Sequence, residues 1–157
     1  MTVTGIETAP RGKKHRVFLD GAYAFSLYGG ELRRYRVEIG EELSEEAHRE
    51  ITEEVLQKRA LLYAAHLLQA REYSVERMRR KLRESGYAED CIRRTLSYLA
   101  ERRFLDDRRF AREYIARFLG NKSRRMLYRK LVGEYGIAEA VFDSAFTEAL
   151  SGEEAED

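Results

Sequence analysis

The sequence repeats itself with an offset of 50 residues, and this repeat constrains the fold more than any other feature. Gly86-Tyr87-Ala88-Glu89 precedes Gly136-Ile137-Ala138-Glu139 by that offset, and apolar positions on both sides also match. Each repeat predicts two helices, a turn and a third helix, because the glycine suits the left-handed residue that ends a helix. We therefore predict two tandem three-helix repeats, at residues 59–105 and 106–150.

Residues 1–43 predict a small β-rich segment ahead of the helices. His15–Leu19 and Ala22–Leu27 are separated by Asp20-Gly21, a pair that tolerates the positive φ angles of a two-residue hairpin turn. A further strand is expected near the N-terminus, and the first 40 residues as a whole are interpreted as strands and turns. The fold class is thus mainly α, with tandem three-helix repeats preceded by a small β-hairpin or three-strand segment.

An acidic helix is expected to connect the two parts, at residues 44–58. Ser44 is a good N-cap, and the acids that follow it complement the helix dipole. One long helix that continues into the first repeat and two helices with a break near Lys58 both fit the pattern. Residues 151–157 form an acidic tail.

Composition restricts the class of protein and its compartment. A chain with 36% charged residues and a single proline suits an ordered, helix-rich protein. Its one cysteine, Cys91, allows no intramolecular disulfide, and no apolar run approaches the roughly 20 residues that span a bilayer. We expect a cytoplasmic protein that does not associate with membranes.

The net charge of +1 conceals a strong segregation of charge along the chain. Residues 38–54 carry 1 basic and 8 acidic groups, whereas residues 55–147 carry 21 basic and 12 acidic groups. Guanidinium groups make bidentate contacts with phosphate and with carboxylate. The basic region therefore predicts a partner that is either nucleic acid or an acidic protein surface.

Asp106 and Asp107 stand just before an aromatic and arginine-rich run. Paired carboxylates can perform acid–base chemistry or hold a metal, but either aspartate also suits the start of the next helix. The arginines on both sides are expected to keep the pair ionised and paired, so we favour a helix cap. The apolar residues that follow are spaced as a core-facing stripe: Phe110, Ala111, Tyr114, Ile115 and Phe118.

Catalytic chemistry is scarce in the rest of the sequence. The three histidines lie in different predicted elements without metal-ligand spacing, and Cys91 is expected to pack in an amphipathic helix. No serine lies in a nucleophile-elbow pattern. We expect no enzyme activity, no metal and no cofactor.

Two basic helix faces are the candidate binding site. The second helix of each repeat buries an apolar stripe and exposes cations, and no acid occurs between Lys122 and Lys130. Recurrence in both repeats favours a binding role over a merely solvated face. The candidate residues are Arg77, Arg80, Lys81, Arg83, Lys122, Arg125, Arg129 and Lys130.

Four motifs in this order resemble the RecX family of bacterial recombination regulators. They are ARxxS at residues 70–74, KLxxxGY at 81–87, LxxxxFLDDRRFAxxY at 99–114 and KLxxxxGI at 130–137. The resemblance covers roughly residues 59–150, and the hairpin sequence LDGAYAF is similar to the N-terminal extension of some members.

The resemblance implies a non-enzymatic protein that binds the RecA recombinase, inserts in the groove of RecA filaments on single-stranded DNA and modulates, usually inhibits, their activity in DNA repair, recombination and the SOS response. Members commonly carry three repeats, whereas two are found here. The partners implied are RecA and single-stranded DNA, bound directly or within the filament, and a monomer is expected. Two alternatives remain: a free-standing nucleic-acid-binding protein with helix-turn-helix-like units, and a scaffold with solvated basic faces.

Overall fold

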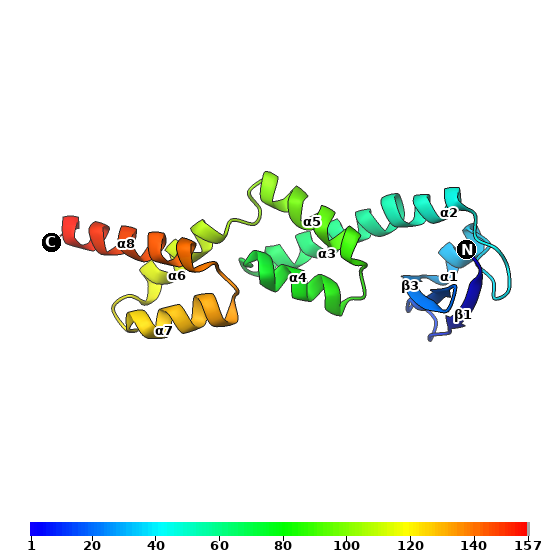
Figure 1. Cartoon of the computed structure of the whole chain (residues 1–157), viewed down its shortest axis with the longest axis horizontal. Coiled ribbons are helices and arrows are strands. Elements are labelled where there is room, and N and C mark those ends of the chain that lie inside the picture. The colour runs from blue at the N-terminus through cyan, green and yellow to red at the C-terminus, as the bar shows by residue number, and fades with distance from the viewer. Residues whose placement is uncertain (157) are drawn as a thin grey trace. The chain divides into compact units, whose positions relative to one another are not determined.

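A small sheet precedes a series of helices in the computed structural model, which describes residues 1–156 and their side chains through Gly152 (Figure 1). Asp157, the last residue of the predicted acidic tail, lies outside the described residues. In chain order the elements are β1 (Val3–Glu7), β2 (His15–Leu19), β3 (Ala22–Leu27), α1 (Gly29–Arg34), α2 (Glu45–Arg49), the π-helical η1 (Glu50–Val55), α3 (Leu56–Ala70), α4 (Val75–Glu84), α5 (Glu89–Glu101), α6 (Asp107–Phe118), α7 (Arg124–Tyr128), the π-helical η2 (Arg129–Glu134) and α8 (Glu139–Glu156).

The chain divides into two compact units that are described separately. Unit 1 comprises residues 1–62 and 82–94, and unit 2 comprises residues 63–81 and the chain from Thr95 onward. Helices α3, α4 and α5 each contribute residues to both units.

Unit 1 is built on an antiparallel sheet with the strand order β1-β2-β3. The hairpin prediction is confirmed: β2 and β3 have the expected bounds, and Asp20 and Gly21 join them with φ angles of 49° and 84°. Two positive φ angles in a two-residue turn match the twist of the flanking strands. One face of the sheet packs against η1 and the start of α3, and this core consists of Val3, Val17, Leu19, Phe25, Leu27, Val37, Leu43, Ile51 and Leu56.

The interpretation of the first 40 residues as strands and turns is wrong for α1, which is helical from Gly29 to Arg34. The Glu31 carboxylate accepts a hydrogen bond from the Tyr28 backbone N–H at 2.8 Å, and this satisfies one of the free donors at the helix start. After the two glycines, Glu, Leu and Arg are all good helix formers. Arg59 from α3 pairs with Glu31 and donates to the Ser26 carbonyl at 3.0 Å, which ties α1 to the helix.

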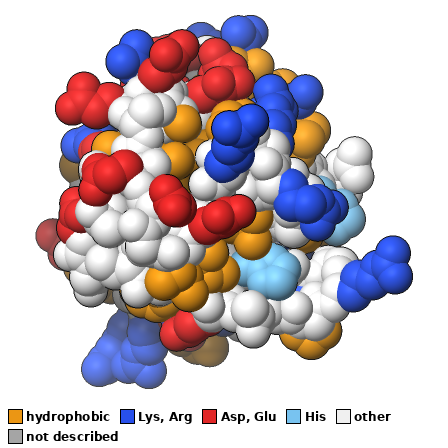
Figure 2. Space-filling model, turned by 90° about the vertical axis from the view of Figure 1, so that its right-hand side faces the viewer, with side chains coloured by type: hydrophobic (Ala, Val, Ile, Leu, Met, Phe, Trp, Pro, Cys, Tyr) orange, Lys and Arg blue, Asp and Glu red, His pale blue; other side chains and the backbone are white. Residues whose placement is uncertain are grey.

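A continuous helical run links the sheet to the repeats. Ser44 caps it as predicted, because its hydroxyl accepts from the Ala47 backbone N–H at 3.1 Å. The run passes through Lys58 without a break, and its irregularity is the π-helical segment η1 instead. The glutamates around this cap are exposed, and Figure 2 shows acidic side chains gathered on the surface at this end of the chain.

Unit 2 contains the second repeat, with the predicted order of two helices, a glycine turn and a third helix. Gly136 has a φ of 69° and Gly86, its counterpart in the first repeat, has a φ of 87°, as expected for left-handed residues after a helix. The predicted stripe on α6 faces the core of the second repeat. This core consists of Ala111, Ile115, Leu127, Leu131, Ile137, Phe142 and Ala145, with Phe110, Tyr114 and Phe118 packed against it.

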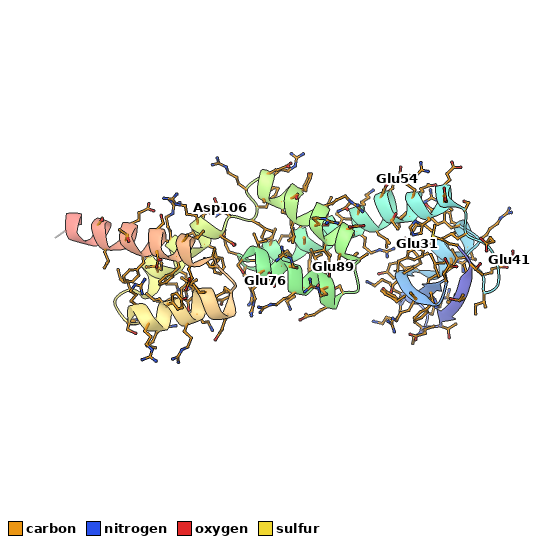
Figure 3. All side chains as sticks on the ribbon, viewed as in Figure 1. Glu31, Glu41, Glu54, Glu76, Glu89 and Asp106 are labelled. Carbon is orange, nitrogen blue, oxygen red and sulfur yellow. The ribbon has the colours of Figure 1, made fainter. Side chains whose placement is uncertain are left out.

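The helix-cap prediction for the aspartate pair is confirmed for Asp106. Its carboxylate accepts from the Arg109 backbone N–H at 3.0 Å at the start of α6 (Figure 3). The expected pairing with neighbouring arginines is wrong, because Arg108 pairs with Glu148 at 3.6 Å and Arg109 with Glu72 at 3.4 Å. The side chains of Arg108 and Arg109 thus pair with glutamates distant in sequence and not with the adjacent aspartates.

Candidate functional site

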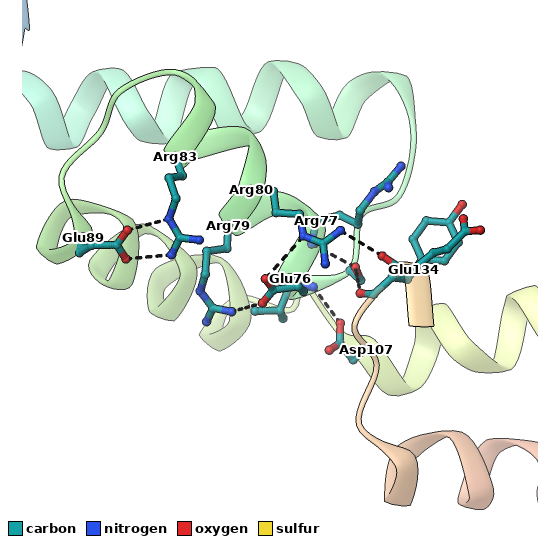
Figure 4. A network of polar contacts seen from close by, with 11 residues as sticks. Glu76, Arg77, Arg79, Arg80, Arg83, Glu89, Asp107 and Glu134 are labelled. Carbon is teal, nitrogen blue, oxygen red and sulfur yellow. Dashed lines mark hydrogen bonds and ion pairs between the residues drawn. The ribbon is translucent and has the colours of Figure 1, made fainter. Parts of the chain in front are cut away.

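Arg77 and Arg80 of α4 already contact other residues of unit 2. The Arg77 guanidinium lies over the Tyr135 ring at 5.1 Å. Arg80 is 3.7 Å from Glu76 and donates to the Glu134 carbonyl at 3.3 Å (Figure 4). These two arginines therefore join α4 to the end of η2 and to Tyr135 just after it, and they are only partly available to a partner.

Backbone capping strengthens the same junction. The Ser74 hydroxyl donates to the Tyr135 carbonyl at 2.6 Å, and Asp107 accepts from the Val75 backbone N–H at 2.9 Å (Figure 4). Burial raises the pKa of Asp107 above its ordinary value, while this hydrogen bond opposes the shift. The second aspartate of the pair thus caps a helix of the preceding repeat, a role that the local sequence pattern did not indicate.

Close packing at the glycine turn completes the junction. A Cβ at Gly136 would lie 2.6 Å from the Glu76 Cβ. Because real Cβ atoms do not approach each other so closely, only glycine allows the chain to pass α4 at this point.

Arg83 and Lys81, the remaining α4 candidates, belong to different units. In unit 1, Arg83 makes a bidentate contact with Glu89, at 2.8 and 3.2 Å (Figure 4). In unit 2, Lys81 lines a small pocket together with Arg71 and makes no ion pair within residues 1–152. The four α4 candidates therefore do not form one free basic face.

Lys122 does not lie on the outward face of a helix, so that prediction is wrong. Helix α7 begins only at Arg124, because Ser123 is its N-cap and accepts from the Met126 backbone N–H at 3.2 Å. Lys122 precedes the cap and folds back onto α6, with its ammonium 4.4 Å from the centre of the Phe118 ring and 3.3 Å from the Tyr114 hydroxyl.

Arg125 and Arg129 are the candidates that the structure leaves most accessible. Both are exposed and make no ion pair in the part of the chain whose side chains are described. Lys130 instead pairs with Glu134 at 2.7 Å, and this contact raises the pKa of Lys130 and lowers the pKa of Glu134. The structure therefore leaves a basic surface of two arginines on α7 and η2, which we call the Arg125–Arg129 surface.

The sequence interpretation missed Arg71 and Tyr73, which lie in the loop between α3 and α4. Both line the same pocket as Lys81. Arg71 is the charged residue of the ARxxS motif, and this motif could have identified it, whereas Tyr73 stands at a position that the motif leaves open.

The described residues lack both a metal-binding cluster and a membrane-spanning helix. No group of three or more His, Cys, Asp or Glu residues among them could hold a metal ion. None of the helices described is both long enough and apolar enough to cross a bilayer. Cys91 is buried, as expected of a packing residue.

Comparisons with known proteins identify relatives of this chain. Residues 60–99 match the family model for the first three-helix domain of RecX. The chain is 26% identical to the regulatory protein RecX of Caldanaerobacter subterraneus subsp. tengcongensis, over 93% of this chain and 76% of the relative. It is 30% identical to the regulatory protein RecX of Lactobacillus gasseri, over 93% of this chain but only 54% of that longer relative.

A solved structure agrees with these sequence matches. The crystal structure of a regulatory protein RecX aligns with a TM-score of 0.59 and 25% identity, over 94% of this chain and 73% of the other. The similarity thus extends through the sheet and both repeats. By family model, curated relatives and solved structure alike, the chain is similar to RecX regulatory proteins.

Proposed function

We propose that this protein regulates the RecA recombinase by binding RecA filaments on single-stranded DNA, and that it inhibits their ATP hydrolysis and strand exchange. It would act as a monomer in the cytoplasm and would thereby regulate recombination and DNA repair. Similarity to RecX regulatory proteins across the sheet and both repeats is the observation that carries this proposal. We also propose that residues 59–105 and 106–150 are its repeats.

The Arg125–Arg129 surface is the part of the predicted site best placed to bind the filament. Its two guanidinium groups are exposed and have no intramolecular carboxylate among the described side chains. A partner that offers carboxylates or phosphates would gain bidentate contacts without first breaking an ion pair. Arg80, Arg83 and Lys130 each have an ion pair to break or share, and Arg77 has its contact with the Tyr135 ring.

The first experiment is a titration of RecA's DNA-dependent ATP hydrolysis with this protein at substoichiometric ratios. Binding to the same single-stranded DNA without RecA is measured in parallel. Inhibition well below stoichiometry, with weak binding to naked DNA, is the expected result. No effect on hydrolysis together with tight, salt-sensitive DNA binding would instead favour the free-standing nucleic-acid-binding alternative.

The surface itself is tested by replacing Arg125 and Arg129 together with glutamate. Inhibition should be lost, while thermal stability stays close to that of the wild type because both side chains are exposed. The matched control replaces Arg33 and Lys58 with glutamate, which changes the net charge equally at exposed positions elsewhere. Equal loss of inhibition in both double variants would contradict the assignment.

A further inference from the structure

A small pocket of about 190 Å³ lies in unit 2 where the loop after α3, the start of α4 and two aromatic rings meet. Basic and aromatic side chains dominate its lining. They are Arg71, Tyr73, Arg77, Lys81, Phe110 and Tyr135. The pocket is smaller than the roughly 300–1,000 Å³ of typical small-molecule sites. It is therefore suited to one group of a longer chain rather than to a free ligand.

The charge of the pocket is positive and largely uncompensated. Glu72 is the one carboxylate in the lining. It pairs at 3.4 Å with Arg109, which does not line the pocket. Arg71 and Lys81 make no ion pair within the described side chains. Two cations that share a concave surface without a carboxylate partner favour the binding of an anion.

Two of the three aromatic rings in the lining already contact other side chains, and the third, Tyr73, does not contact a ring or a cation among the described residues. Tyr135 is in contact with Phe110 at 5.1 Å and with Arg77 at 5.1 Å, so its ring forms the wall of the pocket. Tyr73 makes no ring or cation contact with the described residues and is only partly buried. An unengaged ring next to unpaired cations can accept a flat, anionic ligand.

Single-stranded nucleic acid is the polymer that uses both features together. Its phosphates are attracted to cations along a groove, and its bases stack on aromatic side chains without regard to sequence. An acidic peptide would use Arg71 and Lys81 but would leave the Tyr73 ring without a specific role. Glutamine and asparagine, which read base edges, are absent from the lining, in agreement with contacts that do not depend on sequence.

We propose that this pocket holds one nucleotide of single-stranded DNA, with a phosphate at Arg71 and Lys81 and the adjoining base stacked on Tyr73. The inference rests on the proposed function, since it specifies a direct DNA contact for a protein that acts on RecA–DNA filaments. It also assigns a role to Arg71 and Lys81, the charged residues of the ARxxS and KLxxxGY motifs that lie here.

The base contact can be read directly, because the chain contains no tryptophan. Tyr73→Trp introduces a single fluorescent reporter at the pocket. Titration with an oligothymidylate should quench this fluorescence, whereas an abasic oligomer with the same number of phosphates should bind without quenching. Equal quenching by both oligomers, or quenching by neither, would overturn the stacking contact.

The phosphate contact is tested by salt dependence in fluorescence anisotropy with the same oligothymidylate. The double variant Arg71→Gln/Lys81→Gln should lower the slope of log affinity against log salt by about 0.7, as expected when the one phosphate that both side chains contact is no longer neutralised. Tyr73→Leu should weaken binding about five- to hundredfold with the slope unchanged, and Tyr73→Phe should retain wild-type affinity. Lys58→Gln, an exposed lysine outside the pocket, serves as the matched control and should leave the slope unchanged.

An acidic competitor separates the two possible partners. If polyglutamate quenches the Tyr73→Trp reporter and the oligothymidylate does not, the pocket binds acidic protein and the inference is wrong. RecA's ATP hydrolysis is followed for the same variants. Inhibition of RecA without oligonucleotide binding at the pocket would contradict this inference alone, whereas oligonucleotide binding without any effect on RecA would contradict the proposed function alone.

Discussion

At the scale of single residues, the basic side chains of this protein differ in what they already contact. Arg77 lies over a tyrosine ring and Arg80 is held by Glu76 and a backbone carbonyl, whereas Arg125 and Arg129 have no ion pair among the described side chains. Exposed ion pairs contribute little to stability, but a cation over a ring also covers apolar surface. Chemically identical residues should therefore respond differently to substitution.

Arg77→Ala should destabilise the protein more than Arg125→Ala does. The contact of Arg77 with Tyr135 is expected to contribute about 0.5–2 kcal/mol, whereas an exposed residue without partners contributes within about 0.5 kcal/mol. Urea unfolding of both variants at one pH measures the difference. Equal losses in the two variants would show that the ring contact does not stabilise the fold.

Asp107 should give the stability a characteristic dependence on pH. Burial raises its folded pKa above the ordinary value of 3.8. At pH values between these two pKa values, the native state binds more protons than the unfolded state. The free energy of unfolding contributed by this group therefore falls as pH rises from the ordinary to the raised pKa. Asp107→Asn keeps an acceptor for the Val75 N–H and removes the titration.

The measurement for Asp107 is urea unfolding of the wild type and Asp107→Asn at a series of pH values from about 4 to neutrality. The wild type should lose stability relative to the variant as pH rises from the ordinary to the raised pKa. A difference that stays constant with pH, or that changes in the opposite direction, would contradict the assigned environment of this carboxyl group.

At the scale of elements, the caps and turns determine where each helix begins and ends. Ser44, Asp106 and Ser123 each accept a backbone hydrogen bond at a helix start, and glycines with positive φ occupy the ends. An N-cap is typically worth about 1 kcal/mol, so such residues define element boundaries at modest individual energies. The Gly136 turn differs because it also packs against α4.

Gly136→Ala should be much more harmful than Gly133→Ala. At Gly136 the left-handed backbone alone costs an L-residue about 1–2 kcal/mol, and the new methyl group would also collide with Glu76. Gly133 lies in η2 with open space around it, so alanine there should be neutral or stabilise by up to about 1 kcal/mol. Thermal or urea unfolding compares the two variants, and similar stabilities would contradict the close packing at the turn.

At the scale of the whole molecule, opposite charges are separated along the chain although the net charge is only +1. The exposed glutamates of residues 38–54 stand ahead of a basic region, and both contribute to the field that an anionic partner meets. Fields of this kind mainly affect association rates and are screened over about 10 Å at 0.1 M salt.

Replacing Glu38, Glu41 and Glu46 with glutamine removes three exposed negative charges and should speed association with RecA filaments on DNA at low salt. Stopped-flow association at increasing ionic strength measures the effect, which should disappear at high salt while the dissociation rate stays the same. A gain that persists at high salt would indicate a direct contact of this segment with the filament instead of a long-range field.

Much of the fold was determined by the sequence alone because its signals are local. The Asp20-Gly21 hairpin, the Ser44 and Asp106 caps and the left-handed glycines each depend on the preferences of a few neighbouring residues. The repeat was likewise predicted from matching residues 50 positions apart, which requires no information about packing. Helix α1 was not predicted because the two glycines at its start have low helix propensity and only a short run of good helix formers follows them.

The candidate site was decided only by the tertiary structure, because the partner of a charged side chain can come from anywhere in the chain. Arg77 meets Tyr135, 58 residues away, and Asp107 caps a helix that begins 32 residues before it. Helical spacing places a side chain on a face but cannot tell whether another element already occupies that face. The tertiary structure alone therefore showed that two exposed arginines of α7 and η2 make no ion pair among the described side chains, whereas those of α4 contact a ring or a carboxylate. It also brought Arg71, Tyr73 and Lys81 to one pocket.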